Sequence, residues 1–96
     1  MKPTAVIVNV ARGEVVEEQA LALALKKGRI GGASLDVFIG EPIAPENPLL
    51  AVAGDKVILT PHVAGVTMES QMRIINMTVD NLVAVIEGRE PVNLVT

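Results

Sequence analysis

A strand, a helix and a second strand follow one another early in the chain, and this order constrains the fold more than any other feature. Residues Ala5–Val10 are apolar and rich in β-branched side chains, which is typical of a strand covered on both faces. Residues Glu17–Lys27 have helical periodicity, with acidic residues first and lysines last, and Gly28 ends the helix. A second strand is predicted at Gly32–Asp36. Such a unit has parallel strands, so the sequence predicts an α/β fold.

The rest of the chain adds one strand and one long helix. The third strand is predicted at Lys56–Thr60, and a helix at Met68–Glu87 with Thr67 as its N-cap. Between the second and third strands, Ile39–Asp55 contains three prolines and two glycines, so we expect a loop with one short turn at Asn47–Val52. The prediction is a single domain, with a parallel sheet of about three strands, flanking helices and a long C-terminal helix.

Composition excludes several classes of protein. The chain has no cysteine and one histidine, which excludes disulfides, thiolate sites and multi-histidine metal sites. A net charge of −3 without basic clusters argues against binding to nucleic acid. No apolar run approaches the roughly 20 residues of a membrane span, and no signal peptide is recognisable. We therefore expect a soluble cytoplasmic protein that binds no metal, nucleic acid or membrane.

Potentially reactive side chains follow the predicted strands. Arg12 comes after the first strand, Asp36 ends the second with Glu41 close behind, and His62 follows the third. The carboxyl ends of parallel strands are where open α/β sheets bind ligands. A guanidinium can bind a carboxylate with two hydrogen bonds, and a carboxylate beside an imidazole prepares it for proton transfer. The alternative interpretation is that these residues are ordinary solvated loop residues.

Several short motifs also occur in a recognisable order. They are Ala11-Arg12-Gly13, Leu35-Asp36-Val37-Phe38, Glu41-Pro42, Asn47-Pro48-Leu49, Thr60-Pro61-His62 and Ala64-Gly65. In this order and with these gaps, the chain resembles the last part of the D-isomer-specific 2-hydroxyacid dehydrogenases, which include phosphoglycerate and hydroxypyruvate dehydrogenases. The resemblance implies that residues 1–96 are the C-terminal part of an NAD(P)-binding Rossmann domain.

The resemblance also implies roles for individual residues. Arg12 would bind the carboxylate and carbonyl of a 2-oxo acid, and Glu41 would pair with His62. His62 would protonate the carbonyl during hydride transfer from the nicotinamide, and act as the base in the reverse direction. The residues implied to bind NAD, with NADP not excluded, are Val10, Ala11, Arg12, Asp36, His62, Ala64 and Gly65.

Two departures from the family pattern bear on function. No Gly-x-Gly-x-x-Gly occurs, so the sequence lacks the loop that binds the pyrophosphate and the acidic residue that binds the ribose. The sequence also lacks the separate substrate-binding domain of the family. We therefore expect a fragment of an oxidoreductase that is not active alone. Glu17 stands where the family commonly has Asp, Asn or Ser, and we expect a weaker start to that helix.

Two other interpretations remain open at the sequence level. The chain could be a catalytically silent α/β half-domain that associates with itself, or an unrelated flavodoxin-like binding module. An apolar strand at the edge of a sheet invites pairing with another chain, and a broadly apolar helix needs a partner. The sequence thus predicts a homodimer or higher oligomer formed through the edge strand 5–9 or the C-terminal helix.

Overall fold

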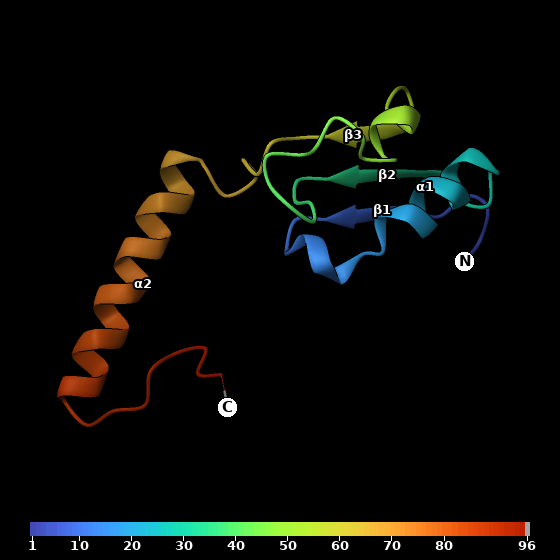
Figure 1. Ribbon diagram of the computed structural model, residues 1–96. Helices are drawn as coiled ribbons and strands as arrows, with labels where there is room; N and C mark the ends of the chain where they lie inside the picture. The colour runs from blue at the N-terminus through green and yellow to red at the C-terminus, as the bar shows by residue number, and fades with distance from the viewer. Residues whose placement is uncertain (96) are drawn as a thin grey trace. The chain divides into compact units, whose positions relative to one another are not determined.

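The computed structural model describes residues 1–95, which form two compact units, Met1–Ala64 and a second that begins at Gly65. The first unit contains a parallel sheet in the order β1-β2-β3 (Figure 1), made of the strands Val6–Asn9, Gly32–Leu35 and Val57–Leu59. Helix α1, Glu18–Lys26, connects β1 to β2. The predicted three-stranded parallel sheet is therefore confirmed.

The register of the strands aligns their carboxyl ends. Asn9 of β1 pairs with Leu35 of β2, and Leu35 pairs with Leu59 of β3. These three residues are the last of their strands, so the segments that start at residues 10, 36 and 60 leave the sheet along one edge (Figure 1). This edge carries the residues that the sequence singled out.

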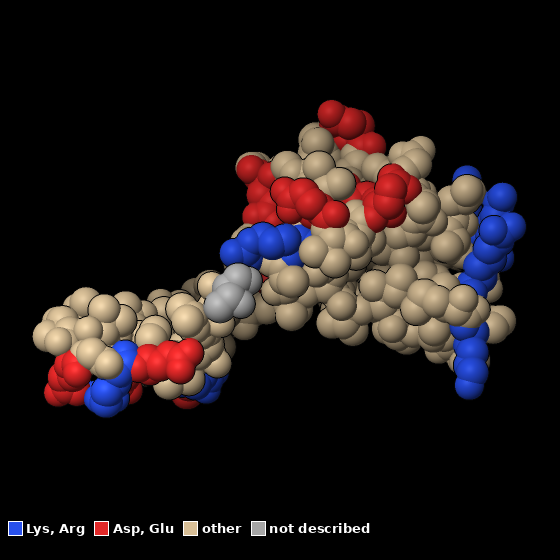
Figure 2. Space-filling model, turned by 90° about the horizontal axis from the view of Figure 1, so that it is seen from below, with Lys and Arg blue, Asp and Glu red and all other residues tan. Residues whose placement is uncertain are grey.

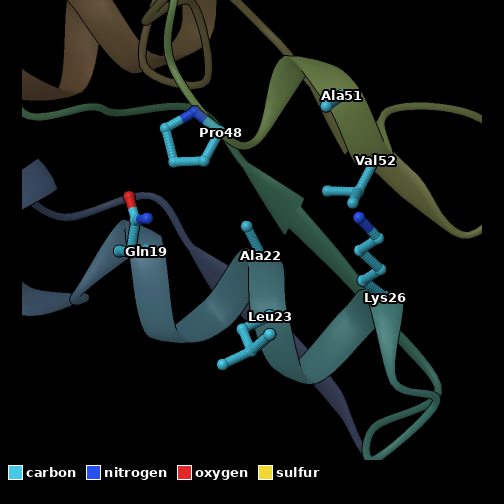
Figure 3. Close-up of a pocket in the computed structure, with 7 residues that line it drawn as sticks. All are labelled: Gln19, Ala22, Leu23, Lys26, Pro48, Ala51 and Val52. Carbon is cyan, nitrogen blue, oxygen red and sulfur yellow. The ribbon is translucent and has the colours of Figure 1, made fainter.

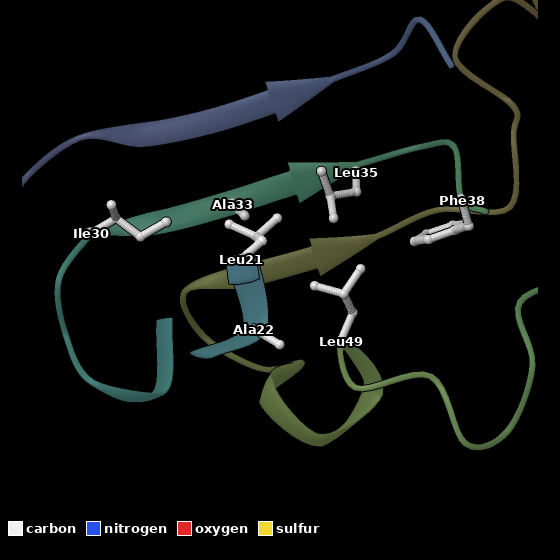
Figure 4. Close-up of a cluster of buried hydrophobic side chains, with 7 residues drawn as sticks. All are labelled: Leu21, Ala22, Ile30, Ala33, Leu35, Phe38 and Leu49. Carbon is white, nitrogen blue, oxygen red and sulfur yellow. The ribbon is translucent and has the colours of Figure 1, made fainter. Parts of the chain in front are cut away.

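The hydrophobic core lies on one face of the sheet, between β2, α1 and the loop before β3 (Figure 4). Leu49 has no exposed surface and Leu35 is 2% exposed. On β1, however, Val6 and Val8 are 60% and 64% exposed. The expectation that β1 is covered on both faces is not met, because an apolar run without alternation does not reveal how many faces have a partner. The core cluster comprises Leu21, Ala22, Ile30, Ala33, Leu35, Phe38 and Leu49.

Two features between β1 and α1 differ from the sequence-based expectations. A short 3₁₀ turn, η1 at Gly13–Val15, was not predicted, and it packs so closely that a Cβ on Gly13 would lie 2.1 Å from the backbone carbon of Phe38. Glu17 is the N-cap of α1, and its carboxylate oxygens accept hydrogen bonds from the N–H groups of Gln19 and Ala20 at 3.1 and 2.6 Å. This geometry is better than expected of a glutamate cap, because the longer side chain folds back over the first turn, while the weaker start to the helix stays a prediction.

The long connection between β2 and β3 is anchored to α1. Glu18 is 9% exposed, and its carboxylate accepts hydrogen bonds from the N–H of Ile39 and the side-chain amide of Asn47, both at 2.7 Å. The predicted short turn is present as the 3₁₀ turn η2, Leu50–Val52. These contacts hold the segment that carries Glu41.

The second unit is dominated by α2, Met68–Ile86, one residue shorter than predicted. Thr67 is its N-cap, and the hydroxyl oxygen accepts a hydrogen bond from the N–H of Ser70 at 3.1 Å. Asn81 exchanges two hydrogen bonds with the backbone of Val92, which ties the tail to the helix. Within residues 1–95, neither α1 nor α2 is both long and apolar enough to span a membrane.

Candidate active site

Asn9 shapes the turn that presents Arg12. Asn9 is 5% exposed at the end of β1, its amide donates to the carbonyl oxygen of Arg12 at 2.8 Å, and its oxygen accepts from the N–H of Ala11 at 3.1 Å. Both side-chain hydrogen bonds close the turn tightly and leave the Arg12 side chain exposed, with its guanidinium donating to the Ala11 carbonyl. Asn9 was not predicted as a site residue, although a polar residue at the end of an apolar strand is a usable signal.

Asp36 holds the loop that carries His62. Asp36 is 3% exposed, and its carboxylate accepts hydrogen bonds from the hydroxyl of Thr60 at 2.5 Å and from the N–H groups of Val63 and Ala64, both at 2.9 Å. The Thr60 hydrogen bond is the main cause that lowers the pKa of Asp36 below its ordinary value. Burial opposes this effect, while the two backbone N–H groups add to it. Asp36 is therefore held as a carboxylate under the loop.

The backbone of His62 is in the left-handed region, with φ of 55°. This conformation is uncommon for a residue with a side chain, and such strain costs about 1–3 kcal/mol. The N–H of His62 donates to the Thr60 carbonyl at 3.1 Å, and the next two N–H groups bind Asp36. The surrounding contacts thus maintain a strained turn at the only histidine of the chain.

The imidazole of His62 pairs with Glu41. Nδ1 lies 2.6 Å from Oε2 of Glu41, and Oε1 of Glu41 accepts a hydrogen bond from the N–H of Phe38 at 3.0 Å. A carboxylate can only accept, so Nδ1 carries the proton of this hydrogen bond and Nε2 is left for a ligand. The hydrogen bond from His62, followed by that from Phe38, lowers the pKa of Glu41.

Arg12, Glu41 and His62 line one hollow of about 240 Å³. They come from three separate segments, which follow β1, β2 and β3 respectively. Glu14 and Phe38 contribute to the same wall. A guanidinium and an imidazole held by a carboxylate thus face a space large enough for a small organic acid, an arrangement that suits proton transfer to a carbonyl group.

A comparison of this sequence with models of known protein families tests the suggested family. The sequence model described as "D-isomer specific 2-hydroxyacid dehydrogenase, NAD binding domain" matches residues 1–64, which include the strands β1, β2 and β3 and the residues Arg12, Glu41 and His62. The chain belongs to this family. The predicted resemblance and the Rossmann-like α/β fold class are thereby confirmed.

Individual family members support the same assignment. A glyoxylate reductase from Korarchaeum cryptofilum is 48% identical over 95 residues, which are 99% of this chain and 28% of that protein. An (S)-sulfolactate dehydrogenase from Chromohalobacter salexigens is 50% identical over 82 residues, or 85% of this chain and 26% of that protein. The crystal structure of a family member from Xanthobacter autotrophicus Py2 in complex with NADPH and MES is 38% identical, with a TM-score of 0.78; the match covers all of this chain and 38% of that one. The chain therefore spans about a quarter to two fifths of the length of these relatives.

The cofactor class of the family is NAD(P), and the described residues fit only one end of such a dinucleotide. Helix N-termini commonly bind a pyrophosphate, but Glu17 already occupies the N–H groups of Gln19 and Ala20 at the start of α1. The strand ends, in contrast, present backbone next to the reactive pair. The residues present are thus compatible with a nicotinamide and not with a pyrophosphate at α1.

Of the other residues implied to bind the cofactor, those in the first unit lie at or near this edge. Val10 and Ala11 directly follow β1 and are exposed, while the N–H of Ala64 is taken by Asp36. Asp36 itself has little surface left for a ligand. Gly65 begins the second unit and is described with it.

Other parts of the first unit lack this chemistry. A hollow of about 310 Å³ between α1 and η2 has Lys26 as its one charged residue (Figure 3) and contains none of the candidate residues. Lysine and arginine side chains gather at one end of the first unit (Figure 2). In the chain, Lys26 and Lys27 end α1, Arg29 precedes β2, and Lys56 precedes β3. Among residues 1–95, no group of three or more His, Cys, Asp or Glu side chains could hold a metal ion.

Proposed function

We propose that this chain provides the substrate and proton-transfer groups for NAD(P)-dependent interconversion of 2-oxo acids and 2-hydroxy acids, with Arg12, Glu41 and His62 as catalytic residues. The observation that supports the proposal best is the 2.6 Å contact between Nδ1 of His62 and Glu41, beside a hollow that Arg12 also lines. Residues 1–96 would be the C-terminal part of the NAD(P)-binding domain, and the relatives named glyoxylate reductase and sulfolactate dehydrogenase fit this class of reaction.

The proposed mechanism assigns one task to each side chain. The Arg12 guanidinium binds the carboxylate of the 2-oxo acid with two hydrogen bonds and fixes its orientation. The nicotinamide, when bound, supplies the hydride that reduces the carbonyl carbon. Negative charge then develops on the carbonyl oxygen, and Nε2 of His62 donates its proton to that atom. Glu41 stays ionised and holds Nδ1–H throughout. In the reverse direction, neutral Nε2 removes the hydroxyl proton.

The proposed nicotinamide pocket is built from backbone at the strand ends. Within the first unit it comprises the segment Val10–Arg12 and the segment around His62 and Ala64. Asp36 belongs to this set as a positioning residue, because its carboxylate holds Val63 and Ala64 in place. The proposal does not distinguish NAD from NADP, because the sequence lacks the ribose-reading acidic residue of a dinucleotide site.

The test uses nicotinamide fluorescence, because the chain contains no Trp or Tyr that would emit nearby. NADH is titrated with the chain, and the readout is binding rather than turnover, because the chain is not expected to be active alone. We expect saturable binding that His62→Ala or Asp36→Ala weakens. Glu46→Gln, an exposed glutamate on the connection between β2 and β3, is the matched control and should leave the binding unchanged. Binding that depends on neither His62 nor Asp36 would refute the proposed nicotinamide pocket.

A second candidate function is self-association of a catalytically silent half-domain. The occupied N-terminus of α1 weighs against dinucleotide binding, and Val6, Val8 and Ile58 of β1 and β3 are 60%, 64% and 59% exposed. β1 is also an edge strand, so a second copy could pair with it and cover these side chains. This candidate predicts a cooperative fold, no NADH binding up to millimolar concentration, and a homodimer or higher oligomer.

Light scattering on an edge-strand variant tests the association. Val8→Lys places a charge on the exposed strand and should convert the oligomer to a monomer. Val15→Lys is the control, because Val15 is 72% exposed but lies in η1, outside the sheet. A clean monomer at micromolar concentration for the unmodified chain would refute self-association.

A further inference from the structure

A second hollow lies against the His62–Glu41 pair and differs in chemistry from the first. It encloses about 400 Å³ and is lined by Phe38, Glu41, Pro42, Ile43, Pro61 and His62. Apart from the ion pair, every lining residue is apolar. Its two proline rings carry no backbone N–H, so this wall offers few hydrogen-bond donors to a polar group.

The two hollows meet at the reactive pair. Phe38, Glu41 and His62 line both of them, while Arg12 lines only the smaller one and Ile43 only the larger. The pair therefore separates a space next to a guanidinium from a space next to apolar side chains. Both spaces lie within the first unit.

The geometry of a 2-oxo acid matches this division. The carbonyl carbon has three substituents in one plane, namely the carboxylate, the oxygen and the side chain. If Arg12 binds the carboxylate and His62 protonates the oxygen, the side chain is the one substituent without an assigned place. The larger hollow is lined by both His62 and Glu41 but not by Arg12, so it lies beside the reactive pair and can take the side chain.

We propose that this apolar hollow is the side-chain subsite, and that the chain favours 2-oxo acids with a branched aliphatic or aromatic side chain. This inference rests on the proposed function. A cavity of about 150 Å³ already accommodates benzene, so a hollow of about 400 Å³ is large enough for an isobutyl or benzyl group. A hydrogen atom or a methyl group would leave most of the space unfilled. The ionised Glu41 in the wall also disfavours a second carboxylate on the side chain.

The experiment measures the affinity of the complete chain for a series of acids, read from the NMR resonances of the His62 ring. The series contains glyoxylate, pyruvate, 4-methyl-2-oxopentanoate and 2-oxoglutarate. We expect 4-methyl-2-oxopentanoate to bind at least about tenfold more tightly than glyoxylate. One methylene group in an apolar pocket changes the discrimination between two substrates by roughly 10- to 200-fold. We expect 2-oxoglutarate to bind more weakly than 4-methyl-2-oxopentanoate.

Variants assign the preference to the hollow. Ile43→Ser should remove the preference for the larger acid, whereas Ile43→Phe should fill the hollow and weaken binding of the larger acid. Ile39→Ser is the control, because Ile39 is 53% exposed and does not line the hollow, so its preference should match that of the unmodified chain. The acid 4-methylpentanoate, which lacks the carbonyl, should bind more weakly than its 2-oxo counterpart.

The outcomes separate the two proposals. Equal or tighter binding of glyoxylate, or a preference that survives both Ile43 variants, overturns the side-chain subsite but leaves the proposed function in place. Equal binding of 4-methylpentanoate also overturns the subsite, because the hollow would then act without the reactive pair. If no acid moves the His62 resonances, the proposed function fails and the subsite fails with it.

Discussion

Gly13→Ala is the most informative single change, because Gly13 joins the segment after β1 to the segment after β2. A Cβ at this position would lie 2.1 and 2.2 Å from the carbonyl carbon and oxygen of Phe38, and 2.5 Å from the nitrogen of Ile39. Carbon atoms in contact stay about 3.5–4.0 Å apart, so the two backbones would have to separate by more than about 1 Å. The Phe38–Ile39 backbone cannot move freely, since its N–H groups bind Glu41 and Glu18.

The expected loss of stability follows from that clash. Overpacking usually costs about 1–3 kcal/mol, and the upper end applies because the opposing atoms are backbone rather than a flexible side chain. A loss of about 3 kcal/mol lowers the melting temperature of a domain of this size by roughly 12–24 °C. The same displacement would move Glu41 away from His62, so the variant should also lose the 2.6 Å pair.

The assay is urea unfolding followed by the NMR resonances of β2, which report on the first unit separately from α2. Gly65→Ala is the control, because a Cβ there meets nothing within 4 Å, and its free energy of unfolding should change by less than about 0.5 kcal/mol. A Gly13→Ala variant as stable as Gly65→Ala would refute the close approach of η1 to Phe38.

Three further predictions follow from the same contacts. The fold lowers the pKa values of Asp36 and Glu41 from 3.8 and 4.5. The stability that these carboxylates contribute is therefore present above those values and is lost as the pH falls through the lower folded-state pKa values. At pH values below about 4, the urea concentration at the unfolding midpoint should decrease. In His62→Ala the carboxyl carbon resonance of Glu41 should titrate at a higher pH, nearer 4.5, and an unchanged titration would show that the pair is absent in solution. Leu49→Ala should lower the free energy of unfolding by about 2–5 kcal/mol, because Leu49 has no exposed surface. Leu50→Ala should lower it by less than about 1 kcal/mol, because Leu50 is 40% exposed. Equal losses would contradict the packing described for the core.

The sequence predicted the site as far as topology determines it. Apolar runs located the strands, and the carboxyl ends of parallel strands lie at one edge of a sheet. The sequence alone therefore predicted that Arg12, Asp36 and His62 lie close together. The level register of Asn9, Leu35 and Leu59 confirms that step. The proton-transfer role of His62 came from the family resemblance rather than from spacing.

The hydrogen bonds within the site could not be predicted, because they join residues that are far apart in the sequence. Asp36 binds the N–H groups of Val63 and Ala64, 27 and 28 positions along the chain, and Glu18 binds Asn47, 29 positions along. No local propensity encodes such pairs. The positive φ of His62 is hidden for the same reason, since it follows from the loop that Asp36 holds rather than from the residue itself.

Coverage of the sheet was the other limit. A short apolar strand has the same composition whether one face or both faces are packed, so the exposed side chains of Val6 and Val8 could not be foreseen. The geometry of the cap at Glu17 could not be predicted, because propensity scales average over side-chain conformations, and one folded-back conformation satisfies two N–H groups.

The central claim is that Arg12 and His62 act on the same small acid, and the most direct test is an NMR titration with oxamate, an analogue of pyruvate that does not accept a hydride. We predict that the Nε–H resonance of Arg12 and the ring resonances of His62 move along one saturation curve. Arg12→Lys should weaken the binding, because lysine cannot form the bidentate contact. Arg29→Lys should leave the binding unchanged, because Arg29 precedes β2 whereas Arg12 follows β1. Two curves with different midpoints, or oxamate that moves neither resonance, would contradict the account.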